Sequence, residues 1–112
     1  MNWVFQKQFV VTVIWGRDFK YEIFPENKEK EARSCYADFL TRYPDAEVEF
    51  RKEEREVSCR MGRFRISDDG QYAVNSDDDE FYYTLPKRTM TDNQIRKFLN
   101  NIYNNETGKQ IL

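Results

Sequence analysis

Most of this chain consists of short runs in which apolar and polar residues alternate, and each run ends at a tight turn. A two-residue period is typical of a β-strand with one buried face. Two longer stretches, near residues 26–42 and 91–108, instead carry apolar residues at three- and four-residue steps, the period of a helix. Because strands joined by short turns pair antiparallel, this order predicts an α+β fold.

The first hairpin is predicted by two neighbouring runs. Residues 9–15 are β-branched and aromatic and apolar on both faces, which predicts a central strand. Gly16, Arg17 and Asp18 form the turn, and the strand that follows alternates, with Phe19, Tyr21 and Ile23 on one face. A helix is then predicted up to Arg42, with this apolar stripe: Ala32, Cys35, Tyr36, Phe39, Leu40 and Tyr43.

A second hairpin is predicted between residues 47 and 59. Val48 and Phe50 share one face of its first strand, and Val57 and Cys59 share one face of its second. An unbroken strand would send Phe50 and Val57 to opposite faces, so we expect a turn within residues 52–55.

A third hairpin is predicted around Ser67-Asp68-Asp69-Gly70, and its register has two alternatives. A two-residue loop pairs Ile66 with Ala73, whereas a three-residue loop pairs Ile66 with Tyr72 and Phe64 with Val74. The second register places four large apolar side chains on one face, so we expect that register. Arg63 and Arg65 then lie on the opposite, solvated face.

A last strand is predicted over residues 81–85, with Phe81, Tyr83 and Leu85 facing the core and Tyr82 exposed. Thr91 and Gln94 have capping-box spacing at the start of the second helix, and Asn104, Asn105 and Gly108 offer a stop. We therefore expect a single α+β domain over residues 1–108 and a tail over residues 109–112. Its mainly antiparallel sheet has about five to seven strands, in the order β-β-α-β-β-β-β-β-α, and two helices pack on one face.

Composition argues against an enzyme. The chain has no histidine, the commonest general base and metal ligand. Cys35 and Cys59 are not part of a CxxC pair, so a zinc site of cysteine and histidine is excluded, and both thiols are expected in the core. We expect no catalytic residues, no cofactor and no metal, and a reduced, cytoplasmic protein without a membrane segment.

Charge is segregated although the net charge is only −2. Residues 68–80 hold six acidic residues and no basic one. This block could bind a divalent cation, but it lacks the spacing of a calcium loop, so a solvated loop is the favoured interpretation. Its other interpretation is a contact surface for a basic protein, for which we name these candidate partner-binding residues: Asp77, Asp78, Asp79, Glu80 and Tyr82.

Arg60, Arg63 and Arg65 suggest an alternative, a nucleic-acid-binding sheet face. The net acidic charge makes that alternative weaker. A nuclease motif beginning at Pro44-Asp45 is rejected because the next strand offers Glu49 and Arg51, not a carboxylate followed by lysine.

The leading hypothesis is a non-catalytic domain that binds another protein, one that is basic or itself binds nucleic acid. The compact, highly charged, glycine-poor and histidine-free chain resembles many small phage or mobile-element proteins that inhibit a host enzyme, although no motif carries that resemblance. Pairing of an exposed strand edge with a second copy, giving a homo-oligomer, is a further alternative.

Overall fold

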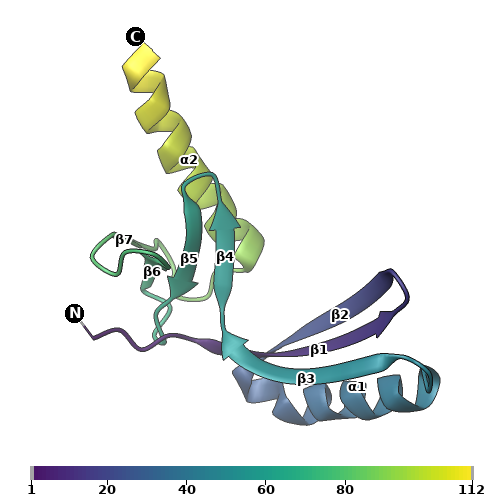
Figure 1. The fold of residues 1–112 in the computed structure, drawn as a ribbon. Helices are drawn as coiled ribbons and strands as arrows, with labels where there is room; N and C mark the ends of the chain where they lie inside the picture. Colours follow the sequence, from purple (N-terminus) through teal and green to yellow (C-terminus); the bar gives the residue numbers. More distant parts are fainter. Residues whose placement is uncertain (1, 112) are drawn as a thin grey trace. The chain divides into compact units, whose positions relative to one another are not determined.

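A computed structural model describes residues 2–111, and the side chains of residues 2–106. Within this part of the chain, seven strands and two α-helices follow one another in the predicted order, which confirms the α+β fold (Figure 1). The chain divides into two compact units, residues 7–54 and the residues up to Gln6 together with those from Arg55 onward. Each unit has a hydrophobic core of its own. The single domain predicted over residues 1–108 stays a prediction.

The first unit is a three-stranded antiparallel sheet with one helix. The strand order is β2-β1-β3, so the apolar run of residues 9–15 occupies the centre, as predicted. A two-residue turn joins β1 to β2, with Gly16 at a φ of 58°. The elements are β1 (Lys7–Trp15), β2 (Asp18–Pro25), the short 3₁₀ helix η1 (Glu26–Lys28), α1 (Glu29–Arg42) and β3 (Glu47–Glu54).

The core of the first unit lies between α1 and one face of this sheet. Val11 and Val13 on β1 are completely buried, and so is Ala32 on α1. Phe39 is 3% exposed and anchors the C-terminal half of the helix. The predicted helical stripe is therefore confirmed at its centre, whereas Leu40 is 48% exposed and lies outside it.

The second unit is a four-stranded antiparallel sheet, in the order β4-β5-β6-β7, with the second helix. The elements are β4 (Glu56–Cys59), β5 (Gly62–Ile66), β6 (Tyr72–Asn75), β7 (Tyr82–Thr84) and α2 (Asp92–Ile111). Phe64 and Ile66 of the sheet and Ile95 and Leu99 of α2 form the centre of its core.

The predicted capping box opens α2. The Thr91 N–H donates to the Gln94 side chain at 2.9 Å, and the Gln94 N–H donates to the Thr91 hydroxyl at 3.2 Å. The expected stop does not end the helix, which continues to Ile111. The tail predicted over residues 109–112 falls where the side chains lie outside the described residues, so it stays a prediction.

The second face of this sheet is covered by the N-terminal segment, which the sequence analysis missed. Phe5 is 8% exposed, and the Arg65 guanidinium lies 4.3 Å from the centre of its ring. Trp3 packs edge-on against Tyr72 and Tyr82, with ring centres 5.3 and 5.2 Å apart. Val74, on the same face, is completely buried as a result.

Two predictions about the strands were wrong. The seven strands form two sheets rather than one, each with its own helix, and β3 and β4 do not form a hairpin. The chain instead leaves the first sheet at Glu54 and enters the second at Glu56. This change of sheet resolves the odd step between Phe50 and Val57, because the two side chains lie in different cores.

Arg55, between the two strands, is held by three groups of the second unit. Its guanidinium donates to the Asp92 carboxylate at 2.7 Å, to the Gln6 side chain at 2.8 Å and to the Met90 carbonyl at 2.9 Å. These bonds hold the start of β4 against the N-terminus of α2, at the point where the chain enters the second sheet.

The register of the third hairpin also differs from the predicted one. Phe64 pairs with Asn75 and Ile66 with Ala73, as the rejected two-residue loop requires. The predicted register assumed one apolar face, but this sheet buries both. Gly70 has a φ of 76°, and a Cβ there would collide with the Arg88 carbonyl, so the loop geometry depends on glycine.

Candidate protein-binding surface

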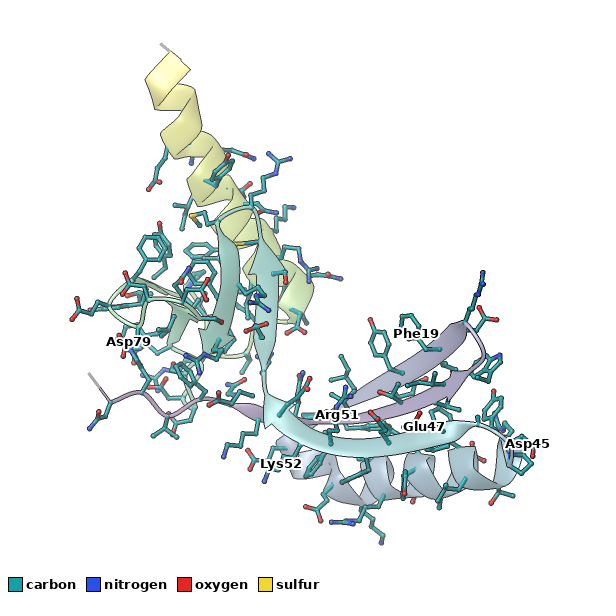
Figure 2. All side chains as sticks on the ribbon, viewed as in Figure 1. Phe19, Asp45, Glu47, Arg51, Lys52 and Asp79 are labelled. Atoms are coloured by element: carbon teal, nitrogen blue, oxygen red, sulfur yellow. The ribbon has the colours of Figure 1, made fainter. Side chains whose placement is uncertain are left out.

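The face of the first sheet opposite α1 carries no other element of its unit, and we call it the open face. Three strands contribute one row each, and the ladder places the rows side by side. Phe19, Glu47 and Arg51 point away from α1, whereas Lys52 lies on the helix side (Figure 2). The open face consists of Phe19, Tyr21 and Ile23 on β2, Val10, Thr12 and Ile14 on β1, and Glu47, Glu49 and Arg51 on β3.

The β2 row is the exposed apolar part of this face. Phe19 is 65% exposed, Tyr21 55% and Ile23 47%. The Phe19 and Tyr21 rings lie nearly parallel, with centres 6.2 Å apart. Val10 and Thr12 in the middle row are buried, so the exposed apolar surface of this face is concentrated on β2.

The turn between β1 and β2 decides that this row faces away from the helix. A two-residue turn pairs Trp15 with Asp18 and therefore Ile14 with Phe19. Paired residues share a face, so the β2 row joins Ile14 on the open side. Lys20 takes the helix side, where its ammonium lies 5.6 Å from the centre of the Phe39 ring.

The β3 row gives the open face an acidic border. The Arg51 guanidinium donates to the Glu49 carboxylate at 2.9 Å and lies 3.9 Å from that of Glu53. Glu47 continues the row at the far end. With two glutamates against one arginine in the row, and Glu53 beyond it, this border carries an acidic excess.

The predicted acidic residues form an ordered, exposed loop in the second unit. The Asn75 side-chain oxygen accepts the N–H groups of Asp77 at 2.9 Å and Asp78 at 3.0 Å. The Asp78 carboxylate accepts the N–H of Glu80 at 3.1 Å. Asp79, labelled in Figure 2, accepts a hydrogen bond at its backbone carbonyl from the Trp3 indole at 2.9 Å.

Tyr82 lies beside this loop, 41% exposed, as the alternation predicted. Its ring forms one cluster with those of Trp3 and Tyr72. The structure therefore brings the predicted partner-binding residues together with two aromatic side chains. Sequence reasoning missed Trp3, and a tryptophan next to an apolar residue at the N-terminus was the only local signal for it.

The three arginines of the nucleic-acid alternative do not form one surface. Arg63 lies 3.8 Å from the Glu56 carboxylate, and Arg65 lies over the Phe5 ring. Arg60, on the turn after β4, instead donates to Asn104 of α2 at 2.8 Å. Only Arg63 and Arg65 share a face of the sheet, and that face also holds Glu56.

Arg60 contributes to a shallow basic depression of about 330 Å³ along α2. Arg96, one of its lining residues, donates to the Ser58 carbonyl at 2.8 Å and so connects α2 to β4. Sequence reasoning missed this group because its asparagines lie on the polar side of the predicted helix, where the apolar period gives no information. The lining residues are Arg60, Asn93, Arg96, Lys97, Asn100, Asn101 and Asn104.

Both thiols pack against a core, Cys35 in the first unit and Cys59 in the second. Burial raises the pKa of the Cys35 thiol, and the nearby carboxylates of Glu22 and Asp38 raise it further. Burial also raises the pKa of the Tyr83 phenol. Among the described residues, no group of three or more cysteine, aspartate or glutamate side chains is placed to hold a metal ion.

Comparison of the chain with protein-family models, with curated proteins and with solved structures finds no match. Neither helix, over the described residues, has a stretch long and apolar enough to cross a lipid bilayer. The case for a function therefore rests on the surfaces described above.

Proposed function

We propose that this chain is a protein-binding module and that the open face is its main contact surface. The observation that carries this proposal is the contiguous exposure of Phe19, Tyr21 and Ile23 on a regular strand. Contiguous exposed apolar groups on a folded protein mark interaction sites, and tyrosine is among the residues that contribute most at interfaces. A sheet also holds the three side chains at fixed spacing, which reduces the entropy lost on binding.

The border of the open face indicates the chemistry of the partner. Glu47 and Glu49 flank the apolar rows, and only Arg51 offsets them. A protein surface that presents apolar side chains bordered by lysine or arginine would match this pattern, and its charges would accelerate association. A module of this kind acts by covering part of its partner, so we propose binding, and through it inhibition, rather than catalysis.

The acidic loop is the second candidate location for the contact. Its carboxylates are exposed, and Tyr82 and Trp3 provide aromatic surface beside it. The open face is favoured because its three apolar β2 side chains are more exposed than Tyr82. The Tyr82 ring, in addition, already packs against the rings of Trp3 and Tyr72. Both locations predict a basic partner, so variants must separate them.

Capture of partners from a lysate of the source cells, with nuclease added to one half, tests the proposal. The chain is compared with the open-face variant Phe19→Ser/Tyr21→Ser and with the loop variant Asp77→Asn/Asp78→Asn/Asp79→Asn. We expect a nuclease-resistant protein that the open-face variant no longer captures and the loop variant still does. With the purified partner, the open-face variant should bind at least about tenfold more weakly, since each of two anchors contributes about 1 kcal/mol or more.

Two results would contradict this assignment. Loss of capture by the loop variant alone would place the contact at the acidic loop. Capture that disappears with nuclease would indicate nucleic-acid binding, and the basic depression around Arg60, Arg96 and Lys97 would then be the site to change. Thermal melting of each variant confirms that it is folded.

A further inference from the structure

We infer that the free edge of β2 pairs with β2 of a second copy of this chain, antiparallel, about a two-fold axis at Tyr21. β2 is the outer strand of its sheet, eight residues long, and seven of these residues are exposed. A long, exposed edge strand is a template for pairing with another strand. The inference does not depend on the proposed function, because it concerns the backbone edge and not the face.

The turn geometry shows which backbone groups of β2 point outward. Gly16 has positive φ and Arg17 does not, as in a type II′ turn, in which Trp15 and Asp18 form a hydrogen-bonded pair. Bonded and non-bonded pairs alternate along an antiparallel ladder. The N–H and C=O groups of Phe19, Tyr21 and Ile23 therefore face away from β1.

The other sheet edges are protected, and β2 is not. β3 presents four glutamates among its eight residues, so a second copy would meet like charges. β4 has four residues and β7 has three, which is short for a stable pairing. β2 has one residue without an N–H, Pro25, and it lies at the very end of the strand.

The side chains of β2 select a single register. Outward groups must meet outward groups, so the axis must pass through a residue of β2. An axis at Lys20 would place lysine opposite lysine and Asp18 opposite Glu22, and an axis at Glu22 would place glutamate opposite glutamate. An axis at Tyr21 instead pairs Lys20 with Glu22 twice and Phe19 with Ile23 twice, and it places no like charges opposite each other.

In this dimer, the two copies of α1 have room to lie side by side. α1 packs against all three strands of its sheet, so it lies over the central strand. In a continuous six-stranded sheet the two central strands would be three strand spacings apart, about 14 Å. Packed helices need only about 8–10 Å between axes, so the two copies of α1 would not collide. The exposed β2 rows of the two copies would then meet in the middle of one apolar surface.

Sedimentation equilibrium of the full chain over a wide range of concentrations tests this inference. We expect a reversible equilibrium between the 13.6 kDa chain and a species of twice that mass. Lys20→Glu should raise the dissociation constant of the dimer about tenfold or more, because two attractive cross-strand pairs become repulsive. Glu22→Lys should do the same, and the double variant Lys20→Glu/Glu22→Lys should restore the original value.

Tyr21→Pro is a second, independent probe. It removes an outward N–H at the axis and leaves the ladder between β1 and β2 complete, so the dimer should be lost while the circular dichroism spectrum is retained. A chain that stays monomeric at every concentration would overturn the inference. A dimer unaffected by Lys20→Glu, or one that the double variant fails to restore, would overturn it as well, because the contact or its register would lie elsewhere.

Discussion

The two sheets of this protein differ in how completely their faces are covered. In the second unit, α2 covers one face and the N-terminal segment covers the other, so Val74 and Phe64 are completely buried although they lie on opposite sides. In the first unit, α1 covers one face, and the other leaves Phe19 and Tyr21 more than half exposed. Aromatic side chains of the N-terminal segment therefore cover the second face of one sheet, whereas the second face of the other sheet has no such cover within its unit.

This difference separates the stability of the first unit from its surface. The core between β1 and α1 is complete without the β2 row, since Val11, Val13 and Ala32 are already fully buried. The exposed row adds nothing to that core, so binding is the role that we assign to it.

Phe39→Ala should mainly lower stability, whereas Tyr21→Ser should mainly weaken partner binding. Phe39 fills the core of the first unit, and its loss should lower the free energy of unfolding by about 3–5 kcal/mol. Tyr21→Ser, on the open face, should change that free energy by only about 0.5 kcal/mol and still weaken partner binding. Denaturant unfolding followed by circular dichroism measures both values.

Leu40→Ser is the matched control for this pair, because Leu40 is an exposed apolar residue on α1, outside the open face. It should leave both stability and partner binding close to those of the original chain. A Tyr21→Ser variant as unstable as Phe39→Ala would show that the β2 row belongs to the core, contrary to the separation proposed here.

Trp3→Ser should make the second unit more like the first. It removes ring contacts with Tyr72 and Tyr82 and a hydrogen bond to the Asp79 carbonyl. We expect the free energy of unfolding to fall by about 1–2 kcal/mol and the binding of an apolar fluorescent dye to increase. Trp3→Phe retains part of the ring contact and should fall between the two. An unchanged melting temperature for Trp3→Ser would show that the N-terminal segment does not stabilise this sheet.

The smallest effect is a pH dependence confined to the hairpin turn of the second unit. The N–H of Gln71 and the hydroxyl of Ser67 donate to the Asp69 carboxylate and hold its pKa below the usual 3.8. A lowered folded-state pKa stabilises the protein above the unfolded pKa, and this contribution is lost as pH falls through the folded value. Asp69→Asn should therefore flatten the acid limb of a plot of melting temperature against pH. An unchanged acid limb would contradict this role.

Local patterns predicted the parts of the fold that local chemistry decides. The hairpin at Gly16 follows from a glycine that can adopt positive φ between two β-rich runs. The cap of α2 follows from the spacing of Thr91 and Gln94, which satisfy each other's backbone N–H groups. The face shared by Phe19, Tyr21 and Ile23 follows from the two-residue period alone.

Contacts between distant segments decided what the sequence analysis missed. Periodicity shows that residues share a face but not which face receives a helix, so the open face could not be assigned in advance. The register of the third hairpin depends on Trp3 and Phe5, about sixty residues earlier in the chain, which make burial of Val74 on the second face possible. The chain changes sheet at Arg55, whose bonds to Gln6, Met90 and Asp92 join residues up to about fifty positions apart in the sequence.

Site-specific photo-crosslinking tests the claim that a protein partner binds at the open face. A photoreactive phenylalanine analogue is placed at Phe19, or at Leu40 as the matched control position, and each protein is irradiated with the captured partner. We predict a covalent complex from position 19 and none from position 40. Equal yields from the two positions, or a complex from position 40 alone, would contradict the claim.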